Sequence, residues 1–172
     1  LKQADVVMAM YLFPDQFDPQ LARANFEYYD PITTGDSSLS PAIQAAVAAR
    51  LGLLDTAVGY LRTAAFLDLS DLAGNTADGV HLATAGGVWH AIVGGFGGLS
   101  WNGGQASLDP HLPPGWTGLR FSMLIHGVRV VVRVEPDRLT LRTAPGSAVE
   151  LKIGGHTHEV DEAGIELDLP LQ

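Results

Sequence analysis

The stretch SPAIQAAVAARLGLLDTAVGYLRTAAFL, residues 40–67, decides the fold of this chain. Its first half repeats apolar residues at helical spacing from Ile43 to Leu51, and its second half does the same from Leu54 onward. Gly52 lies between the halves, where glycine commonly ends a helix. The short connection predicts an αα-hairpin. Successive αα-hairpins build either a solenoid or a toroidal α/α barrel, and periodicity alone favours neither.

Two more helices are predicted before this hairpin. An apolar face at helical spacing over residues 6–11 is ended by Pro14. Asp18 and Pro19 then start a second helix, because aspartate caps helix N-termini and proline suits the first helical position. Pro31 stops this second helix.

The same combination of cap and proline starts the first helix of the hairpin, where Ser40 precedes Pro41. A fifth helix is predicted over residues 76–96. It is rich in alanine and glycine around residues 83–87, a composition that suits close approach of another helix.

The C-terminal part of the chain has a different pattern, typical of antiparallel strands. His126-Gly127 and Gly154-Gly155 are predicted to be tight turns between strands. Alternating or β-branched runs predict strands at residues 119–125, 128–134, 138–143, 149–153 and 156–160.

These two patterns divide the chain into a helical part and a β part. The boundary is predicted near LSWNGGQAS, residues 99–107. We therefore expect a helical domain at residues 1–105 and an antiparallel β-sheet domain at residues 106–172. Helices followed by a separate sheet place the chain in the α+β class.

Composition limits the possible functions. The chain has 172 residues, of which 47% are hydrophobic, enough for a real core. A net charge of -9 argues against nucleic acid or an anionic membrane as a partner. The absence of cysteine excludes disulfides and thiolate metal sites. With no membrane-length apolar run and no signal-peptide pattern, we expect a cytoplasmic protein. The chain opens on an apolar helical pattern without an initiator Met, so we expect a fragment.

Four stretches resemble one known family in order and spacing. They are KQADVVMAMYLFPDQF, FEYYDPITTGDSSLSPAIQAAVAARLG, LDLSDLAGNTADGVHLATAGGVWHAIVGGFGGL and LDPHLPPGW, which together span most of residues 2–126. The sequence resembles the C-terminal part of glycoside hydrolase family 65. This family contains inverting phosphorylases for maltose, trehalose, kojibiose and nigerose, and a few hydrolases.

The resemblance implies an architecture and a reaction. The family has an N-terminal β-sandwich, a linker, an (α/α)6 barrel and a C-terminal β-sheet domain. The chain would then hold the last part of the barrel and the C-terminal domain. The family's general-acid glutamate lies upstream of the Lys-Gln motif, so no residue here takes that role, and Glu27 is not a substitute. The implied substrates are a disaccharide and inorganic phosphate, with no cofactor and with a homodimer as the expected assembly.

Lys2 and Gln3 form the first candidate site. From the pattern alone they are either a solvated helix start or donors of hydrogen bonds to sugar hydroxyls. In the family that this chain resembles, the Lys-Gln pair contacts the transferred glucosyl unit. The resemblance therefore predicts that both residues bind substrate.

The stretch TTGDSSLSP, residues 33–41, is the second candidate site. A helix N-terminus with nearby hydroxyls can hold phosphate, but such a run more commonly caps a helix. In the family this loop lines the phosphate site, which implies phosphate binding by Thr34, Gly35, Ser37 and Ser38. Many members have a histidine where this chain has Gly35. Losing that imidazole weakens the case for phosphate and leaves room for water as the nucleophile.

The histidines give weaker signals. His81 and His90 lie in the Gly- and Ala-rich helical stretch, where most histidines are core or surface residues. His156 and His158 are expected on one face of a strand, but no third ligand is near them in the sequence, so no metal site is predicted.

Three functions stay open. The resemblance favours a phosphorylase that releases β-glucose 1-phosphate, with this part of the enzyme inactive by itself. A hydrolase of the same fold would use water and would turn over without phosphate. A non-catalytic helical binding module would need an exposed basic or aromatic groove. Since residues 1–105 contain four cations and ten acids, an acidic partner for such a module is unfavourable.

Overall fold

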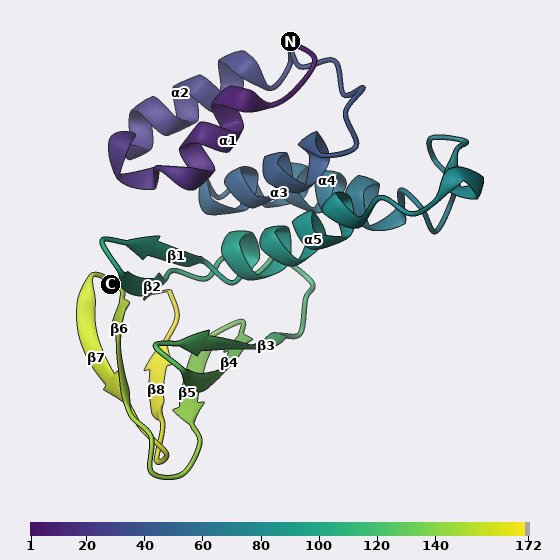
Figure 1. Cartoon of the computed structure of the whole chain (residues 1–172). Helices are drawn as coiled ribbons and strands as arrows, with labels where there is room; N and C mark the ends of the chain where they lie inside the picture. Colours follow the sequence, from purple (N-terminus) through teal and green to yellow (C-terminus); the bar gives the residue numbers. More distant parts are fainter. Residues whose placement is uncertain (171–172) are drawn as a thin grey trace. The chain divides into compact units, whose positions relative to one another are not determined.

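The computed structural model describes residues 1–170 and divides the chain into two compact units (Figure 1). One unit is Leu1–Phe96 and the other is Gly97–Gln172. The first is helical and the second is built from β-strands, as the α+β prediction required. Within the described residues, no helix is both long and apolar enough to cross a membrane.

The helical unit confirms the predicted order of helices. Its elements are α1 (Asp5–Leu12), η1 (Pro14–Gln16), α2 (Pro19–Tyr29), α3 (Ser40–Arg50), α4 (Leu54–Phe66), η2 (Thr76–Asp78), α5 (Leu82–His90) and the π-helical η3 (Ala91–Phe96). Asp18 caps α2 as predicted, because its carboxylate accepts hydrogen bonds from the backbone N–H groups of Gln20 and Leu21, both at 2.9 Å.

Helix α3 is the centre of this unit. Each residue from Ser40 to Ala49 is buried, and α3 packs against α1, α4, α5 and η3. A helix that is apolar around most of its circumference is stable only when it is enclosed. The αα-hairpin predicted over residues 40–67 is therefore confirmed as α3 and α4. The two helices are joined through Gly52, whose positive φ of 72° suits the end of a helix.

Glycines allow helices to approach α3 closely. A Cβ added to Gly87 would lie 2.6 Å from the Cβ of Ala42, and one added to Gly95 would lie 2.8 Å from the Cα of Ala46. Contacts this short are not possible without a shift of the helices. The prediction that small residues near 83–87 serve helix packing is confirmed for Gly87.

The fifth helix differs from the prediction. Residues 76–96 do not form one helix, because the chain leaves η2 at Gly79 with a φ of 131° and α5 begins only at Leu82. The backbone N–H of His81 donates to the carboxylate of Asp68 at 2.7 Å instead of to a helical carbonyl. A side chain from an earlier loop thus determines where α5 starts.

The β unit has two four-stranded sheets. One has the order β1-β2-β6-β7 and the other has the order β3-β4-β5-β8, and we call the latter sheet B. The strands are β1 (Leu99–Asn102), β2 (Gln105–Leu108), β3 (Leu119–Ile125), β4 (Val128–Glu135), β5 (Arg138–Thr143), β6 (Val149–Ile153), β7 (His156–Val160) and β8 (Ile165–Asp168).

All five predicted strands are present, and both predicted turns join paired strands. Three short strands were not predicted: β1, β2 and β8. The pairing is antiparallel except between β2 and β6, which are parallel. Along β4, Val130, Val132 and Val134 are fully buried while Arg129 and Arg133 are exposed, which is the alternation of a half-buried sheet.

The expected boundary between residues 105 and 106 falls at the start of β2. Residues 99–107 are not a linker, since β1 and β2 form a hairpin whose turn is Gly103-Gly104. Ala106 and Leu108 of this hairpin are buried in the β unit. The two units therefore divide earlier, between Phe96 and Gly97.

Candidate functional site

The two candidate segments lie side by side in the helical unit. The backbone amino group of Leu1 donates to the carbonyl of Ile32 at 2.6 Å, and the N–H of Thr34 donates to the carbonyl of Leu1 at 2.7 Å. Backbone pairing of this kind holds the segment with Lys2 and Gln3 along the start of the 33–41 loop. The sequence separates the segments by about thirty residues, and the fold brings them together.

Ser40 does not cap α3, contrary to prediction. It is the first residue of the helix, the N-cap position is Leu39, and no side chain caps this end. The hydroxyl oxygen of Ser40 instead accepts a hydrogen bond from the backbone N–H of Ala4 at 3.2 Å. Both residues are buried, so the bond satisfies a donor that has no access to water.

A small cavity of about 60 Å³ lies where the segments meet. Gln3 and Ser37 both line it, together with Ser40 and the apolar side chains of Met8 and Ile43. Lys2 and Gln3 are exposed, so both can reach a ligand outside this cavity. The cavity is too small for a sugar. A ligand would therefore lie over its mouth.

The hydroxyl groups of the 33–41 loop differ in what they can still bind. Thr34 donates its hydroxyl hydrogen to the carboxylate of Asp36 at 3.0 Å, so this hydrogen is not free for an anion. Ser37 accepts a long hydrogen bond from the N–H of Leu39 at 3.4 Å and keeps its own hydrogen. Within the described residues, the hydroxyl of Ser38 has no hydrogen-bond partner. Ser37 and Ser38 are thus the available donors.

Backbone donors at the start of α3 are fewer than a helix N-terminus normally offers. The N–H of Ser40 donates a hydrogen bond to the carbonyl of Ser37 at 3.2 Å, and Pro41 has no N–H. An anion at this loop would therefore depend on the serine hydroxyls more than on the helix. Gly35 has a φ of 76°, and nothing lies within 4 Å of where its Cβ would be. The glycine is needed here for its backbone conformation and not for space.

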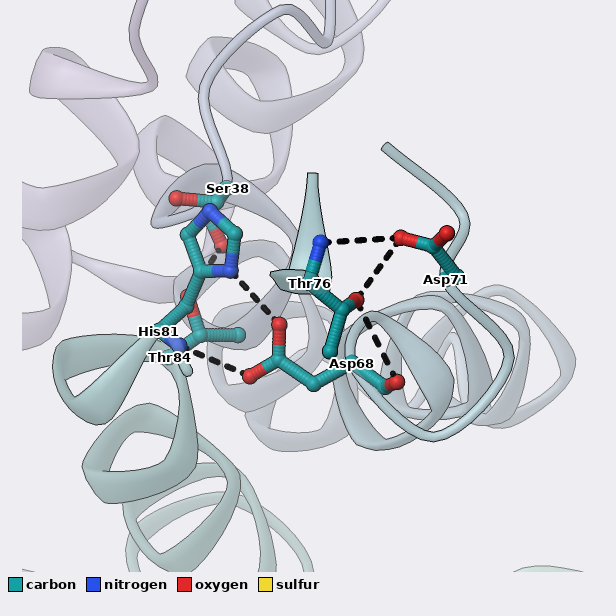
Figure 2. Close-up of polar contacts among 6 residues, drawn as sticks. All are labelled: Ser38, Asp68, Asp71, Thr76, His81 and Thr84. Atoms are coloured by element: carbon teal, nitrogen blue, oxygen red, sulfur yellow. Dashed lines mark hydrogen bonds and ion pairs between the residues drawn. The ribbon is translucent and has the colours of Figure 1, made fainter. Parts of the chain in front are cut away.

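A hydrogen-bond network links the loop to the start of α5 (Figure 2). The hydroxyl of Thr84, a buried residue, donates to the carbonyl of Ser38 at 2.9 Å. One turn earlier, the imidazole Nδ1 of His81 lies 2.6 Å from the carboxylate of Asp68. Asp68 therefore binds both the ring and the backbone N–H of His81, while Thr84 fixes the backbone carbonyl of Ser38.

The same contacts set the charge of the Asp68 carboxylate. The hydrogen bond from the ring of His81, followed by that from its backbone N–H, lowers the pKa of Asp68 below its usual value of 3.8. In the neighbouring turn, hydrogen bonds from the backbone and hydroxyl of Thr76 lower the pKa of Asp71 in the same way (Figure 2). Both carboxylates are ionised at neutral pH, so neither is suited to be a general acid.

Sequence reasoning missed Asp68 and Thr84. Neither residue is part of a spacing pattern, because their partners lie 13 and 46 positions away in the chain. The sequence around His81 indicates only an ordinary core or surface histidine and contains no sign of its pairing with Asp68. Glu27 is exposed and pairs with Arg23 at 3.1 Å, which agrees with leaving it out of the site.

Residues 1–90 match the family model described as the glycosyl hydrolase family 65 central catalytic domain. Residues 99–160 match the model described as the C-terminal domain of the same family. The chain belongs to glycosyl hydrolase family 65. The two matches fall on either side of the division between Phe96 and Gly97, so each compact unit corresponds to one domain of the family 65 architecture.

Relatives of this family 65 chain include proteins named as disaccharide phosphorylases. It is 40% identical over 159 residues to an alpha,alpha-trehalose phosphorylase of Geobacillus stearothermophilus, covering 92% of this chain and 21% of the relative. It is 38% identical over 165 residues to a kojibiose phosphorylase of Escherichia coli K12, covering 96% of this chain and 22% of the relative. An uncharacterized glycosyl hydrolase of Mycobacterium leprae is 42% identical, over 90% of this chain and 20% of that protein.

A solved structure supports the fold of the family 65 chain. A candidate kojibiose phosphorylase from the human microbiome superimposes with a TM-score of 0.91 at 30% identity, over 99% of this chain and 25% of that one. The chain spans about a fifth of the length of the curated relatives that it matches.

Proposed function

We propose that this chain is the C-terminal portion of an inverting disaccharide phosphorylase. The reaction converts an α-linked glucosyl disaccharide and phosphate into β-glucose 1-phosphate and a free sugar. The observation that supports it most is the pairing of the Lys2–Gln3 segment with the 33–41 loop, because it brings sugar donors and anion donors to one place. Two relatives are named trehalose phosphorylase and kojibiose phosphorylase, which agrees with this reaction class.

In this mechanism each segment has a separate task. A carboxylic acid outside this chain protonates the glycosidic oxygen, while phosphate attacks the sugar from the opposite face. Phosphate is already an anion at neutral pH, so it needs positioning more than a strong base. Lys2 and Gln3 orient the sugar hydroxyls, and Ser37 and Ser38 donate to the phosphate oxygens. Thr34 and Gly35 shape the backbone of the loop.

The remaining part of the barrel is the partner that we propose for the helical unit. Among the described residues, the exposed large hydrophobic side chains lie in this unit with two exceptions, Trp101 and Leu124. Leu69, Leu82 and Tyr28 are more than 65% exposed. Apolar surface of this extent is typical of an interface, and a missing barrel half would cover it. We also expect the chain alone to be inactive, and the complete enzyme to be a cytoplasmic homodimer.

Hydrolysis is the second candidate function, and two features of the loop favour it. Gly35 provides no imidazole to a phosphate, and Asp36, whose carboxylate accepts from the hydroxyl of Thr34, lies two residues before Ser38. A fixed negative charge beside the loop opposes the binding of an anion. The relative from Mycobacterium leprae is named an uncharacterized glycosyl hydrolase.

Phosphate dependence of turnover separates the two reactions. The polypeptide that includes this chain and the rest of the barrel is incubated with trehalose, kojibiose, maltose or nigerose, with and without phosphate. A phosphorylase forms β-glucose 1-phosphate, seen by ³¹P and ¹H NMR, and is silent without phosphate. Equal release of glucose in both buffers would reject phosphorolysis and leave hydrolysis.

Gly35→His provides a second discriminator. If the loop binds phosphate weakly for lack of an imidazole, this change lowers the KM for phosphate in spite of the positive φ at this position. Gly35→Asn is the matched control, since asparagine tolerates the left-handed conformation without adding an imidazole. A hydrolase would show no phosphate dependence in either variant.

A further inference from the structure

The outer face of sheet B concentrates the positive charge of the β unit. Partners in register on neighbouring strands point to the same face, and so do residues two apart on one strand. Arg120 pairs with Arg133, Val131 pairs with Arg142, and Glu135 pairs with Arg138. Arg129 is two residues before Val131 on the same strand. All five arginines of residues 97–170 therefore lie on this one face, and each is exposed.

This distribution is not explained by ion pairing within the sheet. The guanidinium of Arg133 pairs with Glu135 at 2.7 Å, and that of Arg138 pairs with Glu166 at 2.9 Å. Within residues 1–170, Arg120 and Arg142 have no ion-pair partner. The outer face carries five arginines and three acids, Glu135, Glu166 and Asp168. Its net charge is therefore +2, in a chain whose net charge is -9.

One pair of neighbouring arginines on this face lowers the stability of the sheet unless a negative charge neutralises it. Arg120 and Arg133 are directly opposite in the register of β3 and β4. Like charges at directly opposed positions destabilise a sheet. A bound anion between them would reverse the sign of this contribution, because each guanidinium would then face a negative charge.

Four of the five arginines also line a groove. Arg120, Arg133, Arg138 and Arg142 border a depression of about 440 Å³ on this face, together with Val131, Thr140, Glu135 and Glu166. The space is large enough for a phosphate group with an attached sugar. The hydroxyl of Thr140 is a further donor within the same lining.

We propose that this groove binds a small oxyanion of the phosphate class. Guanidinium groups present a planar fork of donors that matches two oxygens of a phosphate, and they are always charged at physiological pH. The two glutamates at the groove and the net charge of -9 oppose a long polyanion, so nucleic acid is not the occupant. Inorganic phosphate and a sugar phosphate present the same chemistry, and the groove accommodates either.

The groove belongs to the β unit and the 33–41 loop belongs to the helical unit, so this proposal does not rest on the proposed reaction. The test uses the complete polypeptide with Ser37→Ala and Ser38→Ala in place, which weakens the loop. Isothermal titration calorimetry then measures the binding of inorganic phosphate and, in a parallel arm, of glucose 1-phosphate. Sodium chloride at equal ionic strength controls for screening.

Arg120→Gln and Arg142→Gln are the test variants, because their arginines have no acidic partner that would be left alone. Each is expected to raise the Kd of the anion at least about tenfold, the loss typical of one hydrogen bond to a charged group. Arg129→Gln is the matched control, since Arg129 lies on the same face but does not line the groove. It should change the Kd less than twofold. Melting temperatures in phosphate-free buffer verify that the variants are folded.

The outcomes are distinct. Absence of binding in the parent, an unchanged Kd in both test variants, or an equal loss in Arg129→Gln would each overturn the proposal. As a second measurement on the unsubstituted protein, phosphate should protect Arg120 and Arg142 from phenylglyoxal, but not Arg129, as read by mass spectrometry. Equal modification with and without phosphate would also reject the site. The arm with the lower Kd identifies the source of the anion.

Discussion

The backbone N–H of Ala4 donates to the hydroxyl oxygen of Ser40 at 3.2 Å, and both residues are buried. This single bond joins the segment that follows Lys2 and Gln3 to the first turn of α3, which begins two residues after Ser38. Among the residues that the structure describes, it is the hydrogen bond between the two candidate segments that lies in the core. It provides a way to test whether the segments work as one site.

Ser40→Ala should lower the free energy of unfolding by about 1–3 kcal/mol, because the buried N–H of Ala4 loses its partner. It should also raise the KM for the disaccharide, since the Lys2–Gln3 segment loses its anchor. Thermal unfolding and steady-state kinetics of the complete enzyme measure both effects. Full stability with normal kinetics would mean that the bond does not position the segment.

Ser37→Ala and Ser38→Ala should act on phosphate. Each removes a hydroxyl donor to a charged oxygen, worth about 1.5–3 kcal/mol, so the KM for phosphate should rise about tenfold to a hundredfold. Both side chains are only partly buried, and stability should change little. If phosphate kinetics were untouched while stability fell, the serines would serve only the local turn.

Lys2→Ala and Gln3→Ala should act on the sugar. The loss of hydrogen bonds to the transferred unit should reduce kcat/KM by the equivalent of about 2–4 kcal/mol. The effect should be similar at saturating and at low phosphate, in contrast to the serine variants. An unchanged kcat/KM in both variants would remove these residues from the site.

Gly95→Ala and Gly86→Ala should change stability in opposite directions. The added methyl at Gly95 meets the backbone of Ala46 at 2.8 Å, so helix packing must open, at a cost of about 1–3 kcal/mol. Gly86 lies within α5 with open space at its Cβ, so alanine should add about 0.5–1 kcal/mol through helix propensity. Melting temperatures of the two variants, compared with the parent, measure this. A similar loss in both would contradict the packing seen around α3.

Asp68→Asn should remove a pH-dependent part of the stability. Hydrogen bonds from His81 lower the pKa of Asp68 below 3.8 in the folded chain, so the ionised form stabilises the fold. This contribution is present above about pH 4 and is lost as the pH falls through the lowered pKa. The melting temperature of the parent should therefore exceed that of the variant at pH 6, and the difference should shrink toward pH 3. A difference that is constant with pH would show that ionisation of Asp68 is not involved.

Much of the fold follows from local physical chemistry, which is written in the sequence. Asp18 and Pro19 begin α2 through capping and a preset φ, and Gly52 ends α3 through a positive φ. The alternation of Val130, Val132 and Val134 determines which face of β4 is buried. Such features depend on residues within one or two turns of one another, so they could be predicted. The family resemblance likewise rested on contiguous motifs, and the matches to residues 1–90 and 99–160 confirm it.

Other features were decided only by tertiary structure, because they depend on residues far apart in the chain. Ser40 has the residue type and position of a cap, yet the buried N–H of Ala4 competes for its oxygen and Leu39 takes the cap position. The start of α5 depends on Asp68, 13 residues earlier, and the joining of the two candidate segments depends on hydrogen bonds between Leu1 and the loop. A buried donor must find a partner wherever the fold places one. Local sequence pattern predicts the helices and strands. The need of each buried donor for an acceptor, which only the folded core can supply, decides which of their polar groups form hydrogen bonds.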